Sequence, residues 1–155
     1  MKKVIAAALA VLVVLGGVFL YKDHEYRRTY GVVTEVGLFN YDQEVEQSLE
    51  GGSTVLLYFY KQENGAEVDQ QQLDVVKSFA WRNAGKVKVV EINVARLENL
   101  PLAIAHGAIR QPAFVFLSGK KQVNGAHGKF TSLDELNRLK ALIQQIPTVP
   151  APDKN

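Results

Sequence analysis

The sequence predicts an α/β domain, a mixed β-sheet flanked by helices, preceded by one N-terminal transmembrane helix. Three observations predict this architecture. Short runs rich in β-branched and aromatic residues alternate with amphipathic stretches along most of the chain. The last two such runs are separated by a turn alone, which adds a hairpin to a pattern otherwise typical of crossover connections. An uncharged apolar run, from Val4 to Tyr21, precedes them all.

Residues 1–21 are interpreted as a signal anchor that forms the transmembrane helix. Two lysines precede the apolar run, which approaches the length that a helix needs to cross a bilayer. Its bulky exit, Phe19-Leu20-Tyr21, is poor context for signal-peptide cleavage, and Tyr21-Lys22 resembles an interface anchor. A cleaved signal peptide and a buried core helix remain the alternatives. No second run of this kind occurs, so we expect membrane contact through residues 4–21 and at most one crossing.

The start of the chain also predicts where the rest of it lies. Basic residues flank the apolar run in nearly equal numbers, but the two lysines directly before it favour a cytoplasmic N-terminus. We therefore expect a single-pass protein of the bacterial inner membrane, with its C-terminal domain in the periplasm or another extracytoplasmic space. Residues 22–31 would form a juxtamembrane stalk, residues 32–146 the domain, and residues 147–155 a flexible proline-rich tail.

The composition excludes several classes of function. Hydrophobic residues make up 47% and charged residues 22%, as in an ordinary globular protein. Lys and Arg number 18 against 16 Asp and Glu, and without Lys2 and Lys3 the chain is neutral. A neutral domain without a basic stripe is a poor nucleic-acid binder, so we expect no nucleic-acid partner. The absence of cysteine excludes disulfides, thiolate metal sites and thiol nucleophiles, and it fits an oxidising compartment.

Four elements are predicted in the first half of the domain. Residues 32–36 are β-branched and form a strand. Residues 41–49 place acids in the first turn and two apolar residues four positions apart, which predicts a short helix ending at a glycine pair. Residues 54–60 (TVLLYFY) are almost continuously apolar, as in a strand buried on both faces. Residues 66–83 carry an apolar stripe at helical spacing and form a long helix.

Five more elements follow. Residues 87–94 (VKVVEINV) predict a strand. Residues 101–106 predict a short helix, because a proline stands in the first turn of that helix. Residues 113–117 (AFVFL) predict a buried strand, and residues 121–126 return after a turn as an edge strand. A capping box opens the last helix, which spans about 132–146. The order is therefore β-α-β-α-β-α-β-β-α.

This order and the residues that punctuate it resemble the thioredoxin family over residues 32–146. Residues 54–60 and 87–94 match the family's second and third strands, and residues 102–107 match its short helix. Residues 108–112 match the loop that carries its cis-proline, and residues 128–135 match its closing glycine and the start of its last helix. The resemblance implies a thioredoxin-like mixed sheet flanked by helices. It also implies that Pro112 is cis, with an ordinary trans proline at the start of a strand as the alternative.

The chemistry departs from the family at three positions. The family's Cys-x-x-Cys motif falls on Asn64-Gly65-Ala66-Glu67, and the chain has no cysteine. The family's buried acid falls on Tyr58, and Glu63 replaces the aromatic residue that usually precedes the first cysteine. Because dithiol exchange requires a thiolate, thiol–disulfide oxidoreductase activity is excluded, and we expect no catalytic residue.

The residues at the lost motif have an interpretation of their own. Asn64 can cap the helix over 66–83 while Glu67 occupies its third position, an arrangement similar to a capping box. A hairpin turn at Asn64-Gly65 is the alternative. The three histidines, His24, His106 and His127, lack the spacing of metal ligands, so we expect neither a metal site nor a cofactor.

The resemblance also implies a recognition surface that needs no cysteine. In the family, the backbone of the residue before the cis-proline pairs with an extended partner peptide, and here that residue is Gln111. We expect Pro112 to lie beside the Asn64 turn, with its carbonyl and the Gln111 backbone facing outward. The candidate partner-binding residues are Tyr60, Glu63, Asn64, Glu67, Gln111 and Pro112.

These inferences combine into one expected function. The chain would be a redox-inactive, membrane-tethered thioredoxin-like domain that acts through protein–protein contacts. It would serve as an accessory subunit or an assembly factor of a bacterial envelope or membrane complex. One alternative is an enzyme of unknown reaction that uses Glu63 or Glu67 as an acid or base, although no second catalytic group is identifiable. The other alternative is an inert structural spacer.

Overall fold

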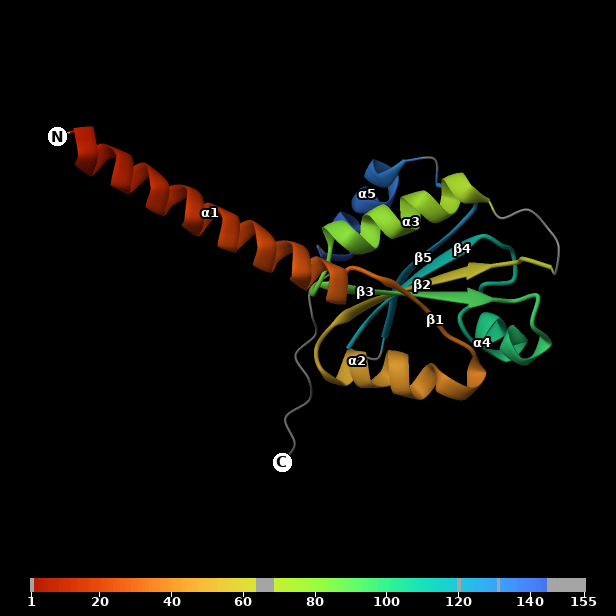
Figure 1. The fold of residues 1–155 in the computed structure, drawn as a ribbon. Helices are drawn as coiled ribbons and strands as arrows, with labels where there is room; N and C mark the ends of the chain where they lie inside the picture. Colours follow the sequence, from red (N-terminus) through yellow and green to blue (C-terminus); the bar gives the residue numbers. More distant parts are fainter. Residues whose placement is uncertain (1, 64–68, 120, 131, 145–155) are drawn as a thin grey trace, which may run out of the picture.

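The computed structural model describes residues 2–63, 69–119, 121–130 and 132–144, with side chains from residue 12 onward except at 121–124, 139, 140 and 142–144. Its centre is a five-stranded sheet of order β1-β3-β2-β4-β5 (Figure 1). β3 is parallel to β1 and β2, whereas β4 is antiparallel to β2 and β5. The predicted mixed sheet is confirmed, with the last strand at an edge. The strands are β1 (Val33–Glu35), β2 (Thr54–Tyr60), β3 (Val87–Asn93), β4 (Ala113–Ser118) and β5 (Lys121–His127).

Helices cover both faces of the sheet, as predicted. Helices α3 (Gln70–Arg82) and α5 (Leu133–Gln144) lie on one face, and α2 (Gln47–Glu50) and α4 (Leu100–Ala105) lie on the other (Figure 1). Short helical turns lead into the second pair. The turns η1 (Leu38–Asn40) and η2 (Asp42–Glu46), of which η2 is π-helical, precede α2, and η3 (Leu97–Asn99) precedes α4.

Strand β2 carries the centre of the core, because its side chains are buried on both faces of the sheet. Leu57 and Phe59 pack into the cluster beneath α2 and α4. Leu56 and Tyr58 pack into the cluster beneath α3 and α5, together with Phe79. The almost continuous apolar sequence of this strand is therefore explained by two cores that share one strand.

Helix α3 begins later than the sequence predicts. Its first residue is Gln70, and its N-cap is Asp69, whose Oδ1 accepts a hydrogen bond of 3.1 Å from the backbone N–H of Gln72. Asn64 is therefore not the cap of this helix. The expectation was wrong because Asp69 is itself a strong N-cap residue and lies directly before the apolar stripe. Asn64 and Glu67 themselves lie outside the described residues.

The N-terminal segment is one continuous helix, α1 (Lys2–Tyr30), which extends away from the sheet (Figure 1). The expected stalk over residues 22–31 is the C-terminal part of this helix rather than a separate element. An ion pair of 2.9 Å between Asp23 and Arg27, one helical turn apart, stabilises this part. No glycine or proline interrupts residues 22–30, so nothing in the sequence ends the helix at Tyr21.

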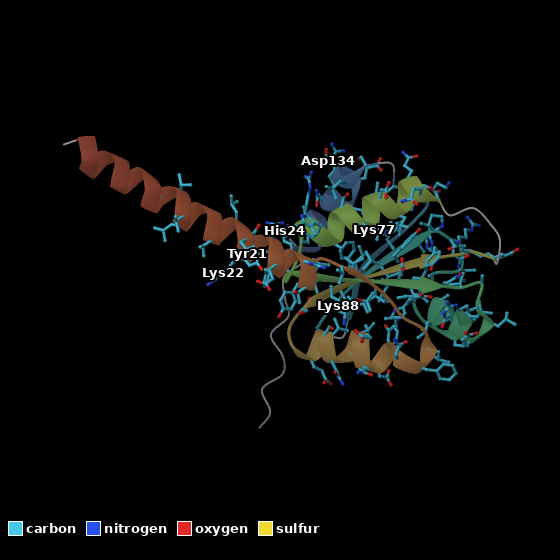
Figure 2. The ribbon with its side chains drawn as sticks, viewed as in Figure 1. Tyr21, Lys22, His24, Lys77, Lys88 and Asp134 are labelled. Atoms are coloured by element: carbon cyan, nitrogen blue, oxygen red, sulfur yellow. The ribbon has the colours of Figure 1, made fainter. Side chains whose placement is uncertain are left out.

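The end of α1 docks on the C-terminal end of α3. Arg27 donates a hydrogen bond of 3.2 Å to the carbonyl oxygen of Trp81, and the His24 ring meets the Trp81 ring edge-on at 5.5 Å. The next residue after α1, Gly31, is buried, and a Cβ there would lie 3.0 Å from the Trp81 Cα. Side chains from both helices therefore fix the direction in which α1 leaves the domain, and Figure 2 labels His24 at this junction.

Within the part of the chain that the structure describes, no helix combines the length and the apolar character needed to cross a membrane. The expected transmembrane helix is therefore not supported by the structure.

Candidate functional site

A cavity of about 390 Å³ opens on the α3 side of the sheet, at the C-terminal ends of β2 and β3. Strand β2 contributes Tyr58 and Tyr60, and β3 contributes Glu91. The loop before β4 contributes Gln111 and Pro112 from the opposite side. Cavities of this size hold a small molecule or one side chain of a partner.

The structure brings together three of the six residues that the sequence singles out for binding. Tyr60, Gln111 and Pro112 line the cavity, although about fifty positions separate the tyrosine from the proline. Glu63 lies in a neighbouring depression that shares Tyr60 with the cavity. Asn64 and Glu67 lie outside the described residues, so the structure places neither.

The loop at the mouth of the cavity contains the predicted cis peptide bond, between Gln111 and Pro112. The expectation for the carbonyl of Pro112 was wrong, because this oxygen accepts a hydrogen bond of 2.8 Å from the backbone N–H of Gly128 and is not available to a partner strand. The side chain of Gln111 donates a hydrogen bond of 2.7 Å to the Ala108 carbonyl. Within the described residues, the backbone of Gln111 makes no hydrogen bond.

One wall of the cavity is aromatic. The rings of Tyr58 and Tyr60 stack with centroids 5.4 Å apart, and Tyr58 stacks on Phe114 at 5.0 Å. Burial is the main cause that raises the pKa of Tyr58 above its ordinary value. Burial, followed by the charges of Glu91 and Glu35, raises the pKa of Tyr60 to about 12. Both phenols are therefore neutral hydrogen-bonding groups at physiological pH.

Glu91 is a half-buried carboxylate that sequence reasoning did not single out. It is the register partner of Tyr58 on the neighbouring strand, so the position where the family's buried acid was expected holds a tyrosine with an acid beside it. Burial, then the nearby charge of Glu35, raises the pKa of Glu91, while Lys77 lowers it. A signal existed in the sequence, because Glu91 interrupts the apolar run Val89-Val90-Glu91-Ile92 of the predicted strand.

The N-terminus of α3 forms the far side of the cavity. Lys129 makes an ion pair with the N-cap Asp69, and a hydrogen bond from Lys129 is the main cause that lowers the Asp69 pKa. Gln72 is only 2% exposed, and its Oε1 accepts a hydrogen bond of 2.8 Å from the backbone N–H of Phe130. That bond fixes the amide orientation, and Nε2 then has no hydrogen-bond partner among the described residues.

The arrangement does not favour the acid–base alternative at Glu63. This side chain is exposed and forms an ion pair of 2.8 Å with Lys61, which lowers its pKa. A general acid at neutral pH requires the opposite shift. Within the described residues, no three His, Asp or Glu side chains are placed to hold a metal ion.

The sequence matches no protein-family profile and no curated protein. Among solved structures, a chain in the complex of ferredoxin:thioredoxin reductase with thioredoxin f2 aligns with a TM-score of 0.63 and 21% identity, over 76% of this chain and 99% of the other. A mutant thioredoxin from Halobacterium salinarum NRC-1 aligns at 0.59 and 23% identity, over 77% and 96%. Thioredoxin f from spinach chloroplast aligns at 0.60 and 20% identity, over 75% and 96%.

These likenesses concern the fold alone, because the sequence identities are low. The chain contains no cysteine with which to carry out thiol chemistry. The chain therefore has a thioredoxin-like fold without the thiols of a thioredoxin.

Proposed function

We propose that this chain is a redox-inactive thioredoxin-like domain that acts through protein–protein contacts. It would be an accessory subunit or an assembly factor of a bacterial membrane or envelope complex. One observation carries the proposal: the cavity at Tyr60, Gln111 and Pro112 is formed, although the chain has no thiol. A binding surface without a reacting group supports recognition rather than chemistry.

Attachment to the bacterial inner membrane through residues 4–21, with the domain on the periplasmic side, belongs to the same proposal. The apolar sequence of this segment supports it. The described part of α1 adds support, because large apolar side chains such as Leu12 and Phe19 are about 70% exposed to solvent. An exposed apolar stretch of this kind usually marks a surface that is covered in the working protein.

The location is tested in the native host by fractionation and protease accessibility. We expect the full chain in the membrane fraction, with the domain digested only after the outer membrane is permeabilised. Mass spectrometry of the purified protein gives the N-terminus, which should be Met1 or Lys2. A chain that begins beyond residue 17 and fractionates with the soluble proteins would contradict membrane attachment.

The contact function is tested by purifying the tagged full chain from native membranes under mild cross-linking. A stoichiometric partner would identify a subunit, and many substoichiometric partners would identify an assembly factor. The variant Tyr60→Leu removes the ring from the cavity and should reduce partner recovery. The control is Leu97→Ser, at an exposed position of η3 on the other face of the sheet. If only the Leu97 variant loses the partner, the cavity is not the contact.

The spacer alternative is favoured by one observation, the docking of α1 on α3 through Arg27 and Trp81. A spacer requires a defined distance and no partner at the cavity. Recovery of the same proteins with wild-type chain and with a chain that carries both Tyr60→Leu and Gln111→Ala would support that alternative over the contact function.

A further inference from the structure

The cavity beside Pro112 holds an acid whose charge has no close counterpart. Glu91 is half-buried, and its carboxylate makes no ion pair or hydrogen bond among the described residues. Lys77 on α3 attracts it without approaching to ion-pair distance. Removing a carboxylate from water without a paired cation costs free energy, so this position is unfavourable for the isolated domain.

The other acids around the cavity differ from Glu91 in this respect. Each has a cation in an ion pair: Asp69 with Lys129, Glu63 with Lys61, and Glu35 with Arg96. Among the described residues that line the cavity, Glu91 is therefore the acid without an ion pair, and Lys77 is the lysine without one. Lys77 is exposed, and an exposed ammonium is stabilised by water without any partner. The balance therefore favours a cationic ligand over an anionic one.

The aromatic wall favours the same ligand. Tyr58 faces Glu91 across the β2–β3 pair, and Tyr60 stacks on Tyr58 at 5.4 Å. Both faces of the Tyr58 ring are covered, one by Tyr60 and the other by Phe114, so the outer face of Tyr60 is the one left to attract a cation or to stack on a guanidinium group. An aromatic wall beside an unpaired carboxylate is the combination that binds an arginine or lysine side chain.

Gln72 supplies a second and independent observation. Its Nε2 is a buried donor without an acceptor among the described residues, on a side chain that lines this cavity. A buried donor of this kind costs free energy until it finds an acceptor. A basic side chain offers none, but the carbonyl groups of the peptide that carries it do. A basic residue within a polypeptide would supply both a cation for Glu91 and a carbonyl acceptor for this donor.

We propose that the cavity receives an arginine or lysine side chain of the partner, held between the ring of Tyr60 and the Glu91 carboxylate. This inference rests on the proposed contact function, and it specifies the chemistry of the partner segment that lies over Gln111. Arginine is the preferred side chain, because its planar group both stacks on a ring and pairs with a carboxylate.

The inference is tested by NMR titration of the full-length chain in detergent micelles. The probe is N-acetyl-arginine amide, and its matched control is N-acetyl-citrulline amide, which has nearly the same shape without the charge. We expect millimolar binding of the arginine probe, with shifts centred on Tyr58, Gln72 and Glu91, and binding at least about tenfold weaker for citrulline. Equal binding of the two probes, or no binding of either, overturns the inference.

Three variants locate the binding energy. Glu91→Gln keeps the shape of the side chain and should weaken arginine binding about tenfold. The control Glu98→Gln removes an exposed acid on η3 and should leave the affinity unchanged. Lys77→Met removes the competing cation and should strengthen binding by a few-fold. Weaker binding in the Lys77 variant, or tighter binding of N-acetyl-glutamate amide than of the arginine probe, would show an anion site and overturn the inference.

The two proposals fail separately. Partner recovery that depends on Tyr60 and not on Glu91 would overturn the basic-residue inference and leave the contact function intact. Specific arginine binding at the cavity, together with no partner in native membranes, would overturn the contact function instead.

Discussion

The Tyr26 ring of α1 lies directly over Gly85, so closely that a Cβ on Gly85 would stand 1.7 Å from the tyrosine Oη. The glycine also has a φ of +72°, a conformation that side chains rarely adopt. This close approach, together with the Trp81 contacts, connects the N-terminal helix to the domain.

The first prediction concerns this junction. Gly85→Ala should displace Tyr26 and loosen α1 from α3, in addition to the cost of about 1–2 kcal/mol for a left-handed backbone. Because Trp81 is the only tryptophan in the chain and contacts His24, its fluorescence should report the change. Gly52→Ala is the matched control, since Gly52 has a φ of +81° and no neighbour within 4 Å. We expect Gly85→Ala to lower the free energy of unfolding more than Gly52→Ala does. Equal losses in the two variants would contradict the docking of Tyr26.

The second prediction concerns the pH dependence of stability. Burial, followed by the charge of Glu35 on β1, raises the pKa of Glu91, and Lys77 on α3 opposes this shift. Because the folded state raises this pKa, it favours the protonated form of Glu91. The free energy of unfolding is therefore greatest below the pKa that Glu91 has in the unfolded chain, and it falls as pH rises through the pKa that Glu91 has in the folded domain. The phenols of Tyr58 and Tyr60 on β2 stay neutral in this range.

Replacing Glu91 with glutamine should therefore raise the free energy of unfolding at pH 7. This advantage should shrink as pH falls through the raised folded pKa of Glu91 and should be gone below the unfolded pKa of about 4.3. Urea denaturation at several pH values measures the difference. Glu98→Gln, at an exposed position, should show no such trend. A Glu91 variant less stable than wild type at pH 7 would mean that Lys77 compensates the carboxylate fully.

The third prediction tests the core beneath α3. Phe79 is fully buried and meets the Phe116 ring edge-on at 6.1 Å. Phe79→Ala removes a large buried ring and should lower the free energy of unfolding by about 3–5 kcal/mol. Ser78→Ala changes an exposed neighbour on the same helix and should be nearly neutral. Guanidinium denaturation compares the two variants, and a loss below about 1 kcal/mol for Phe79→Ala would contradict the packing.

The fourth prediction tests the start of α3. Asp69→Ala removes both the helix cap and the ion pair with Lys129, whereas Asp69→Asn keeps a capping oxygen and removes only the charge. We expect the alanine variant to lose about 1 kcal/mol and the asparagine variant much less, because exposed ion pairs contribute little. Thermal unfolding measures both. Equal losses would assign the stabilisation to the ion pair instead of the cap.

Much of the fold could be predicted from the sequence because local patterns determine it. The apolar run of β2 and the alternation of strands and helices predict the sheet, since a strand buried on both faces needs a helical layer on each side. The resemblance placed the cis bond before Pro112 correctly. These features depend on the order of the elements, which the sequence shows directly.

The rest depended on contacts between distant residues, which no local pattern shows. The hydrogen bond from Gly128 that occupies the Pro112 carbonyl forms between two separate loops. The late start of α3 depends on Asp69, which Lys129 contacts from sixty positions away. Glu91 became part of the candidate site only because β3 aligns it with Tyr58. Which residues meet in a site depends on the register between paired strands and on how the chain crosses between them. The spacing of residues along the sequence reveals neither of these.

The sheet order has a consequence for the growing chain. β1 pairs only with β3, and β2 has β3 and β4 as its neighbours. No two strands can therefore pair before Val87–Asn93 has been synthesised, so the first eighty-six residues carry two strands that are not each other's partners. A nascent chain of that length exposes the apolar run of β2 with nothing to pair with it, which makes this stage the most prone to aggregation. The domain is thus expected to fold late in translation, and a stall before β3 should be the point at which chaperones are needed most.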